Sequence, residues 1–121
     1  MNIQDYAELL MERAKWNGSA ATQLTGVPDA DYLIREHDAI AHVQYTSSLL
    51  VTSGIENGDL ARVCDELFQR ATYNLNCAKN NTALSELDML EYAAVGHTLA
   101  GIATDVNMIL TLSEVRPSDL D

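Results

Sequence analysis

Apolar residues recur at intervals of three and four along most of this chain, which is the spacing of an amphipathic helix. The clearest stripe lies between about residues 60 and 79 and consists of Leu60, Val63, Cys64, Leu67, Phe68, Ala71, Leu75 and Ala78. A later stripe predicts a helix from about residue 83 or 86 to residue 112, and consists of Tyr92, Val95, Leu99, Ile102, Val106 and Ile109. No segment has a convincing strand pattern. The chain is therefore predicted to be all-α.

Residues that start and stop helices set the expected bounds of the remaining elements. Asn2 is a suitable N-cap for a first helix from about Ile3 to Lys15, which the segment 16–18 (Trp-Asn-Gly) is expected to end. After a loop of about a dozen residues, Pro28 and the acids that follow it predict a second helix from about Asp29 to Ser53, stopped by Gly54. Asp59 is expected to cap the third helix. The core side of the second helix is expected to consist of Leu33, Ile40, Val43, Ser47 and Leu50.

Four helices joined mostly by short loops predict an antiparallel four-helix bundle with a short first helix and long second and fourth helices. With 121 residues and 47% hydrophobic residues, the chain suffices for a single core. We expect one domain over residues 1–115. Residues 116–121 are expected to form a loose tail, because Pro117 prevents much extension of the last helix.

The charge of the chain is strongly negative. Eighteen acids against seven bases give a net charge of −11. In an up-down-up-down bundle the second and fourth helices start at the same end, so seven carboxylates should gather there: Asp29, Asp31, Glu36, Asp38, Glu86, Asp88 and Glu91. We call this set the acidic pole and predict that it binds a lysine- or arginine-rich partner. Helix capping, the helix dipole and solubility explain the same acids without a partner.

The two cysteines and the sequence motifs limit the kinds of chemistry that we expect of this chain. Cys64 and Cys77 lie thirteen residues apart on one predicted helix, which is about 20 Å at 1.5 Å per residue and too far for a disulfide. Free thiols, and acids that interrupt the start before a signal peptide could form, favour the cytoplasm. No Glu-x-x-His pair, C-x-x-C motif or Gly-rich phosphate loop is present, so we predict no metal, cofactor or catalytic residue. The negative charge disfavours nucleic acid and anionic membranes as direct partners.

Residues 96–103, Gly-His-Thr-Leu-Ala-Gly-Ile-Ala, place His97 nearly opposite the apolar stripe of the last helix, at about 100° per residue. This segment resembles the histidine-helix signature of histidine phosphotransfer domains, which are four-helix bundles of similar size. The resemblance covers about eight to thirteen residues and implies that His97 accepts a phosphoryl group and that Gly101 lets a response regulator dock. Ala100 stands where that family has a lysine that helps to hold the phosphate. The structural alternative is a histidine packed among small residues.

Arg35 and His42 lie seven residues apart on the second helix, with Asp38 between them. The arrangement is similar to the motif of HEPN ribonucleases, small helical proteins that build an active site from two copies. The resemblance implies a general base at His42 and an arginine at position 35 that stabilises a pentavalent phosphate. A surface charge network, with Asp38 and His42 paired at i,i+4, explains the same residues without catalysis.

The function that we predict is that of a non-catalytic acidic protein that binds and inhibits a basic, nucleic-acid-handling partner. Phage anti-defence and anti-CRISPR proteins, DNA mimics and bacterial immunity proteins share this size, charge and lack of chemistry. The last helix also has a second side that could form the interface of a homodimer, consisting of Leu90, Ala94, His97, Gly101 and Met108.

Overall fold

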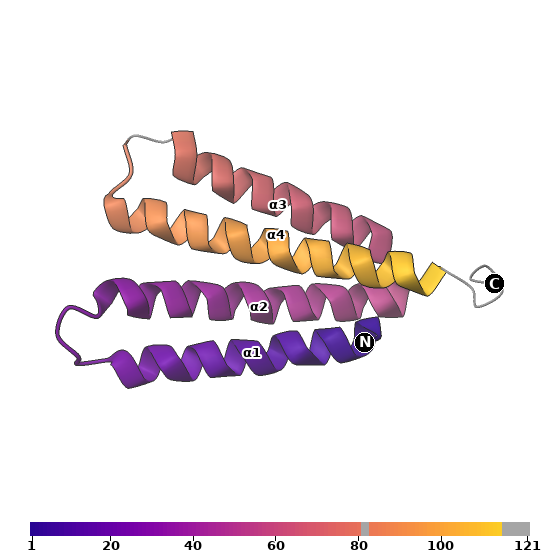
Figure 1. The fold of residues 1–121 in the computed structure, drawn as a ribbon, viewed down its shortest axis with the longest axis horizontal. Coiled ribbons are helices and arrows are strands. Elements are labelled where there is room, and N and C mark those ends of the chain that lie inside the picture. Colours follow the sequence, from indigo (N-terminus) through magenta and orange to yellow (C-terminus); the bar gives the residue numbers. More distant parts are fainter. Residues whose placement is uncertain (81–82, 115–121) are drawn as a thin grey trace.

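The computed structural model describes residues 1–80 and 83–114, and these residues form four α-helices and no strand. The helices are α1 (Ile3–Leu24), α2 (Asp31–Asn57), α3 (Leu60–Asn80) and α4 (Glu86–Glu114), as Figure 1 shows. The prediction of an all-α four-helix bundle is therefore confirmed. The tail predicted for residues 116–121 lies outside the described residues.

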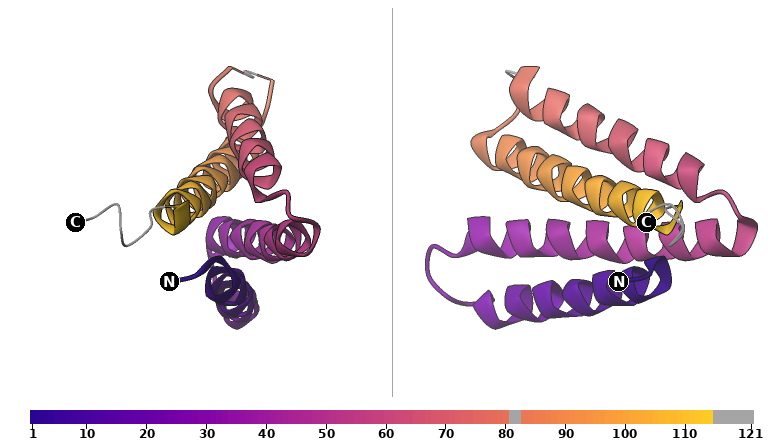
Figure 2. Two further views of the ribbon diagram at one scale, coloured as in Figure 1. Left: turned by 90° about the vertical axis from the view of Figure 1, so that its right-hand side faces the viewer. Right: turned by 45° about the vertical axis from the view of Figure 1, so that its right-hand side comes forward.

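The bundle consists of two antiparallel hairpins, α1 with α2 and α3 with α4. The hairpins meet mainly where α2 packs against α4, whereas α1 and α3 do not touch. In Figure 1 the helices follow one another in the order α3, α4, α2, α1. The two further views of Figure 2 show that the two hairpins are inclined to each other. Because α2 and α4 form the middle of this open arrangement, part of the surface of α4 is left without a helical neighbour.

The first helix is longer than predicted, because the segment 16–18 does not end it. Its buried side continues at intervals of three and four as far as the helix does: Ile3, Ala7, Leu10, Ala14, Asn17, Ala21 and Leu24. The alanines allow α2 to approach closely, and the Ser48 hydroxyl donates a hydrogen bond to the Ala7 carbonyl at 2.7 Å. The expected N-cap is confirmed, since the Asp5 amide donates to Asn2 Oδ1 at 2.8 Å.

Asn17 stays inside the first helix because its side chain has partners in the bundle. Its Nδ2 donates to Gln44 Oε1 at 2.9 Å and to the Arg13 carbonyl at 3.1 Å. Its Oδ1 lies 2.9 Å from His37 Nδ1, which donates because an amide oxygen can only accept a hydrogen bond. A buried asparagine with all its groups paired is compatible with a helix interior. The adjacent Gly18 weakens a helix by only about 1 kcal/mol.

The second helix also differs from its predicted bounds, since it begins at Asp31 and runs past Gly54 to Asn57. Gly54 is buried, and a Cβ built on it would lie 2.8 Å from Val63 Cγ2. The glycine therefore lets α3 pack against the last turn of α2. Gly58, in the left-handed conformation at φ 69°, ends the helix. On the predicted core side Val43 and Ser47 are buried, Ile40 and Leu50 are half-buried, and Leu33 is exposed.

The core lies between the two hairpins and contains Leu10, Val51, Val63, Leu67 and Val106, all nearly inaccessible to solvent. The predicted stripes of α3 and α4 contribute most of their residues to it or pack against it, although Phe68 is 40% exposed. Cys64 is a core residue, as expected, and its thiol donates to the Ala103 carbonyl at 3.5 Å.

Tyr6 connects the two hairpins directly. Its hydroxyl donates a hydrogen bond to Asp105 Oδ2 at 2.7 Å, which joins α1 to α4. Burial of the ring, followed by the hydrogen bond to Asp105, raises the pKa of Tyr6 above its ordinary value.

Candidate functional site

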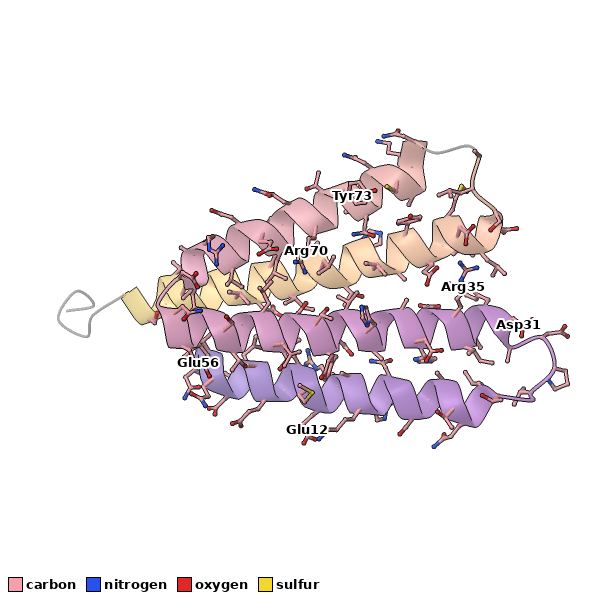
Figure 3. The ribbon with its side chains drawn as sticks, turned by 180° about the vertical axis from the view of Figure 1, so that it is seen from behind. Glu12, Asp31, Arg35, Glu56, Arg70 and Tyr73 are labelled. Carbon is pink, nitrogen blue, oxygen red and sulfur yellow. The ribbon has the colours of Figure 1, made fainter. Side chains whose placement is uncertain are left out.

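The starts of α2 and α4 lie side by side and are joined by Arg35. Its Nε and Nη2 donate to Glu91 Oε2 at 3.1 and 2.8 Å, and Nη2 also donates to Asp88 Oδ1. Two helices that started at opposite ends could not make these contacts. The structure thus places the two groups of acids at one end of the bundle, as the topology argument predicts. Figure 3 shows Asp31 and Arg35 at this end and Glu56 at the other.

Arg35 changes the ionisation of the carboxylates that it contacts. The hydrogen bond from Arg35, and then that from Ser85, hold the pKa of Asp88 below its usual value. The same ion pairs raise the pKa of Arg35. The lowered pKa keeps Asp88 charged, and the guanidinium of Arg35 compensates part of the negative charge of Asp88 and Glu91.

The other five acids of the acidic pole form no ion pair in the described part of the chain: Asp29, Asp31, Glu36, Asp38 and Glu86. Glu36 accepts a hydrogen bond from the Tyr32 hydroxyl, which raises the pKa of that tyrosine. Lys79 ends α3 at the same end of the bundle but pairs with none of the seven carboxylates. The acidic pole thus keeps a strong excess of negative charge.

A groove begins at the acidic pole and runs between α2 and α4, with Asn74 of α3 at its side. Its volume is about 420 Å³, and it is lined by Asp38, Ala39, His42, Val43, Asn74, Glu91, Tyr92 and Val95. We call it the α2–α4 groove. Val43 is buried in its floor, while Asp38 and His42 are exposed. The volume is in the range of pockets that hold a small molecule or an anchoring side chain. An apolar floor with carboxylates at the edge suits a side chain that is both aliphatic and cationic.

Of the residues that line this groove, only Asp38, His42 and Glu91 have a functional role predicted from the sequence. Ala39, Val43, Tyr92 and Val95 look like core positions, and Asn74 belongs to the third helix. No pattern within a single helix could predict this groove. Its lining residues come from three helices, which are brought together only where the two hairpins meet.

Arg35 and His42 of α2 have different surroundings in the structure. The guanidinium of Arg35 is engaged by Asp88 and Glu91, so its charge is already compensated. His42 is exposed at the edge of the α2–α4 groove, and its side chain has no hydrogen-bond or ion-pair partner within residues 1–80 and 83–114. The expected pair between Asp38 and His42 does not form. Arg35 is therefore not free to stabilise a phosphate beside His42.

His97 is exposed on α4, opposite the buried residues Leu99, Ile102 and Val106. The same outer side carries Leu90 and Met108, which are 38% and 55% exposed, with Gly101 exposed and Ala94 half-buried. The helix Glu86–Glu114 contains no lysine or arginine. His97 is thus accessible, as a phosphoacceptor must be, but α4 supplies no cation to hold a phosphoryl group.

The high apolar content of α4 has a further consequence. Glu86–Ser113 contains an 18-residue window with a mean hydropathy of 1.2, so this helix is long and apolar enough to cross a bilayer, while 28% of that window is buried inside the protein. One such helix is weak evidence for a membrane span, since core helices pass the same test.

Among residues 1–80 and 83–114, no three His, Cys, Asp or Glu side chains come together in a way that could hold a metal ion. Comparisons with protein-family models, with curated proteins and with solved structures found no match. The candidate site therefore stands on its geometry and charge: the acidic pole and the α2–α4 groove that opens beside it.

Proposed function

We propose that this protein is a non-catalytic inhibitor whose acidic pole covers a basic, nucleic-acid-binding surface of its partner. The observation that carries the proposal is the contact of Arg35 with Asp88 and Glu91, because it places the acids of two helix starts on one surface. Phage anti-CRISPR proteins, DNA mimics and toxin-immunity proteins provide the analogy, which is one of size, charge and missing chemistry.

The physical basis is the attraction between a carboxylate surface and a surface that evolved to hold phosphates. A groove lined with lysine and arginine concentrates negative charge in its field, so a protein of net charge −11 is steered to it. Carboxylates presented on a rigid pair of helices can replace phosphates there and exclude nucleic acid. The α2–α4 groove adds apolar surface beside the charges, into which a lysine or arginine stem fits.

The decisive experiment compares two variants of equal charge. Asp31→Asn with Asp38→Asn removes two unpaired acids from the acidic pole, whereas Glu56→Gln with Asp65→Asn removes two exposed acids from the last turn of α2 and the second turn of α3. Both variants have the same net charge. We expect association with immobilised protamine, an arginine-rich probe, to slow about tenfold for the first pair and much less for the second. Equal losses would mean that net charge, and not the acidic pole, drives binding.

The biological partner is sought by affinity capture from a bacterial lysate at low and at moderate ionic strength. The proposal requires that a basic or nucleic-acid-handling protein is recovered, and that its recovery falls as salt screens the charges. Recovery of no such protein, or binding that is indifferent to salt, contradicts it.

The exposure of His97 makes the phosphotransfer alternative testable in the same preparation. A phosphorylated response regulator would label the wild type and not His97→Ala, and the absence of an acid-labile phosphate would end this alternative. The ribonuclease alternative requires RNA cleavage that is lost in Arg35→Ala and in His42→Ala. Our proposal expects no activity in either assay.

A further inference from the structure

The outer side of α4 is an uncharged strip on a strongly charged protein. We call it the α4 outer strip, and it consists of Leu87, Leu90, Ala94, His97, Gly101, Thr104, Met108 and Leu112. All of these residues are exposed except Ala94, which is half-buried, and Leu112 reaches 67% exposure. Between Glu91 and Glu114 the only charged residue of α4 is Asp105, and it accepts the hydrogen bond of Tyr6.

α2 also exposes Tyr45 and Leu49 in a stretch without charged residues between Asp38 and Glu56, but α1 and α3 present no such strip along their length. α1 exposes Glu8, Glu12 and Lys15, and α3 exposes Arg62 and Asp65. Large exposed apolar residues that share one helix face and are free of charge are unusual on a monomer and mark an interaction surface. The low amphipathicity of α4 has the same origin, since the helix is apolar toward α2, toward α3 and toward solvent.

We propose that the α4 outer strip binds a second copy of this chain, with the two α4 helices antiparallel across a twofold axis that passes outside the strip midway between the levels of His97 and Gly101. The strip is complementary to itself in an antiparallel register, which supports a second copy as the occupant, and the distribution of charge determines where the two copies can meet. Two molecules of net charge −11 repel each other over most of their surface, so the uncharged strip is where they can approach at the lowest electrostatic cost. This inference is independent of the proposed function, which concerns the acids at the starts of α2 and α4.

The direction of packing follows from the acids at the start of α4. Parallel helices would place Glu86, Asp88 and Glu91 of the two copies together, which like-charge repulsion disfavours. Antiparallel helices send the two acidic poles to opposite ends of the dimer. Both poles then remain free.

The antiparallel register also matches large side chains with small ones. With the axis at this level, residues of the strip whose numbers add up to 198 face each other across the interface. Leu90 then faces Met108 of the second copy, Ala94 faces Thr104, and His97 faces Gly101. A Cβ built on Gly101 would have no atom within 4 Å in the single chain, so this glycine leaves a space. The imidazole of His97 from the second copy can fill this space. The twofold axis produces the same contact a second time, between His97 of the first copy and Gly101 of the second.

The area of the α4 outer strip determines how tightly we expect the dimer to associate. From Leu87 to Leu112 it is about 38 Å long at about 1.5 Å per residue, and it is about 10 Å wide, which gives roughly 400 Å² per copy. A standard stable interface takes about 800 Å² per partner. A groove of about 240 Å³ between α1 and α4 borders the strip at Met108 and Leu112, and its lining includes the apolar Leu9 and the charged Arg13 and Asp105. We therefore expect a weak dimer, with a dissociation constant in the micromolar range or above.

The test uses two glycines that both lie in helices and both face open space. Gly101→Glu places a carboxylate in the α4 outer strip, and Gly18→Glu makes the same change on α1. Sedimentation velocity up to millimolar concentration should show a monomer–dimer equilibrium for the wild type and for Gly18→Glu. Gly101→Glu should raise the dissociation constant at least tenfold. If Gly101→Glu does not fold, Met108→Glu at a 55% exposed position makes the same test.

Two results would overturn the inference: a wild type that stays monomeric at millimolar concentration, or a dimer that Gly101→Glu leaves intact. Salt gives a third criterion. Because screening reduces the repulsion between the copies, the dimer should tighten as ionic strength rises. The proposed function has the opposite salt dependence, so the failure of one proposal is distinguishable from the failure of the other. Binding to vesicles of zwitterionic lipid that Gly101→Glu abolishes, with the wild type monomeric, would assign the strip to a lipid surface instead.

The register is tested by crosslinking in a Cys77→Ala background, since the remaining Cys64 is buried. A mixture of His97→Cys and Gly101→Cys proteins should form a covalent dimer with a short bis-maleimide more efficiently than either protein does separately. Parallel packing would instead crosslink His97→Cys to itself most efficiently, and that result would overturn the antiparallel arrangement.

Discussion

Arg35 of α2 holds Glu91 of α4 through two hydrogen bonds to one carboxylate oxygen, at 3.1 and 2.8 Å. This contact joins the two hairpins at the end of the bundle where negative charge is most concentrated. Without the guanidinium, the starts of α2 and α4 would repel each other. Arg35 thus has a structural role inside the acidic pole.

Replacing Arg35 tests that role. We expect Arg35→Met to lower the melting temperature at neutral pH, because Asp88 and Glu91 lose their cation. Asp88 has a lowered pKa in the folded protein, so the stabilisation is complete above the ordinary pKa of about 3.9 and disappears as pH falls through the folded value. Differential scanning calorimetry from pH 7 to pH 2 should show the two melting temperatures converge below pH 4. A difference that stays constant with pH would contradict the ion pair.

Substitution by alanine should have opposite effects on the stability of the protein at two glycines of α4. A Cβ on Gly96 would lie 2.6 Å from Leu75 Cγ, whereas a Cβ on Gly101 would meet no atom within 4 Å. Gly96→Ala should therefore destabilise the protein by about 1–3 kcal/mol through overpacking of α3 on α4. Gly101→Ala should stabilise it by up to about 1 kcal/mol through helix propensity. Urea unfolding measures both, and equal effects would mean that α3 and α4 are not in close contact at Gly96.

Asn17 provides a test of the extended first helix. Asn17→Ala leaves the buried Gln44 side chain, and the Nδ1–H of His37, without their partner. We expect a loss of about 1–3 kcal/mol in the free energy of unfolding. Asn76→Ala, at an exposed position of α3, should change it by less than about 0.5 kcal/mol. If Asn17 lay in a loop, the two variants would behave alike.

The hydroxyl of Tyr6 should be visible in an alkaline titration. Its pKa is raised in the folded state, so its contribution to stability is complete below about pH 10 and is lost as pH rises above that value. Tyr6→Phe should cost about 0.5–1.5 kcal/mol at pH 7 by removing the hydrogen bond to Asp105. The variant should also lose part of the alkaline sensitivity. Chemical denaturation at pH 7 and pH 11 measures both effects, and a stability gap that does not narrow at high pH would contradict the raised pKa.

The hydrophobic pattern determines that this chain is all-α, because the intervals of three and four along residues 60–79 and 92–109 can be buried on one side only by a helix. It also determines the side of α4 on which His97 lies, since a helix of regular pitch sets the angle between His97 and Leu99. The placement of acids at helix starts is a local property as well. These features depend on neighbours within a few residues of each other.

The features that the sequence pattern does not predict depend on contacts between residues that are far apart in the sequence. Asn17 and Gly18 look like a helix end until Gln44 and His37 pair with Asn17 across the hairpin. Leu33 looks like a core residue, but the bundle stays open there and leaves it 44% exposed. The α2–α4 groove, and the choice of which side of α4 stays uncovered, depend on how two hairpins pack through α2 and α4. Periodicity within one helix specifies which side is apolar. It cannot specify which neighbour covers that side, because the packing free energy belongs to pairs of helices.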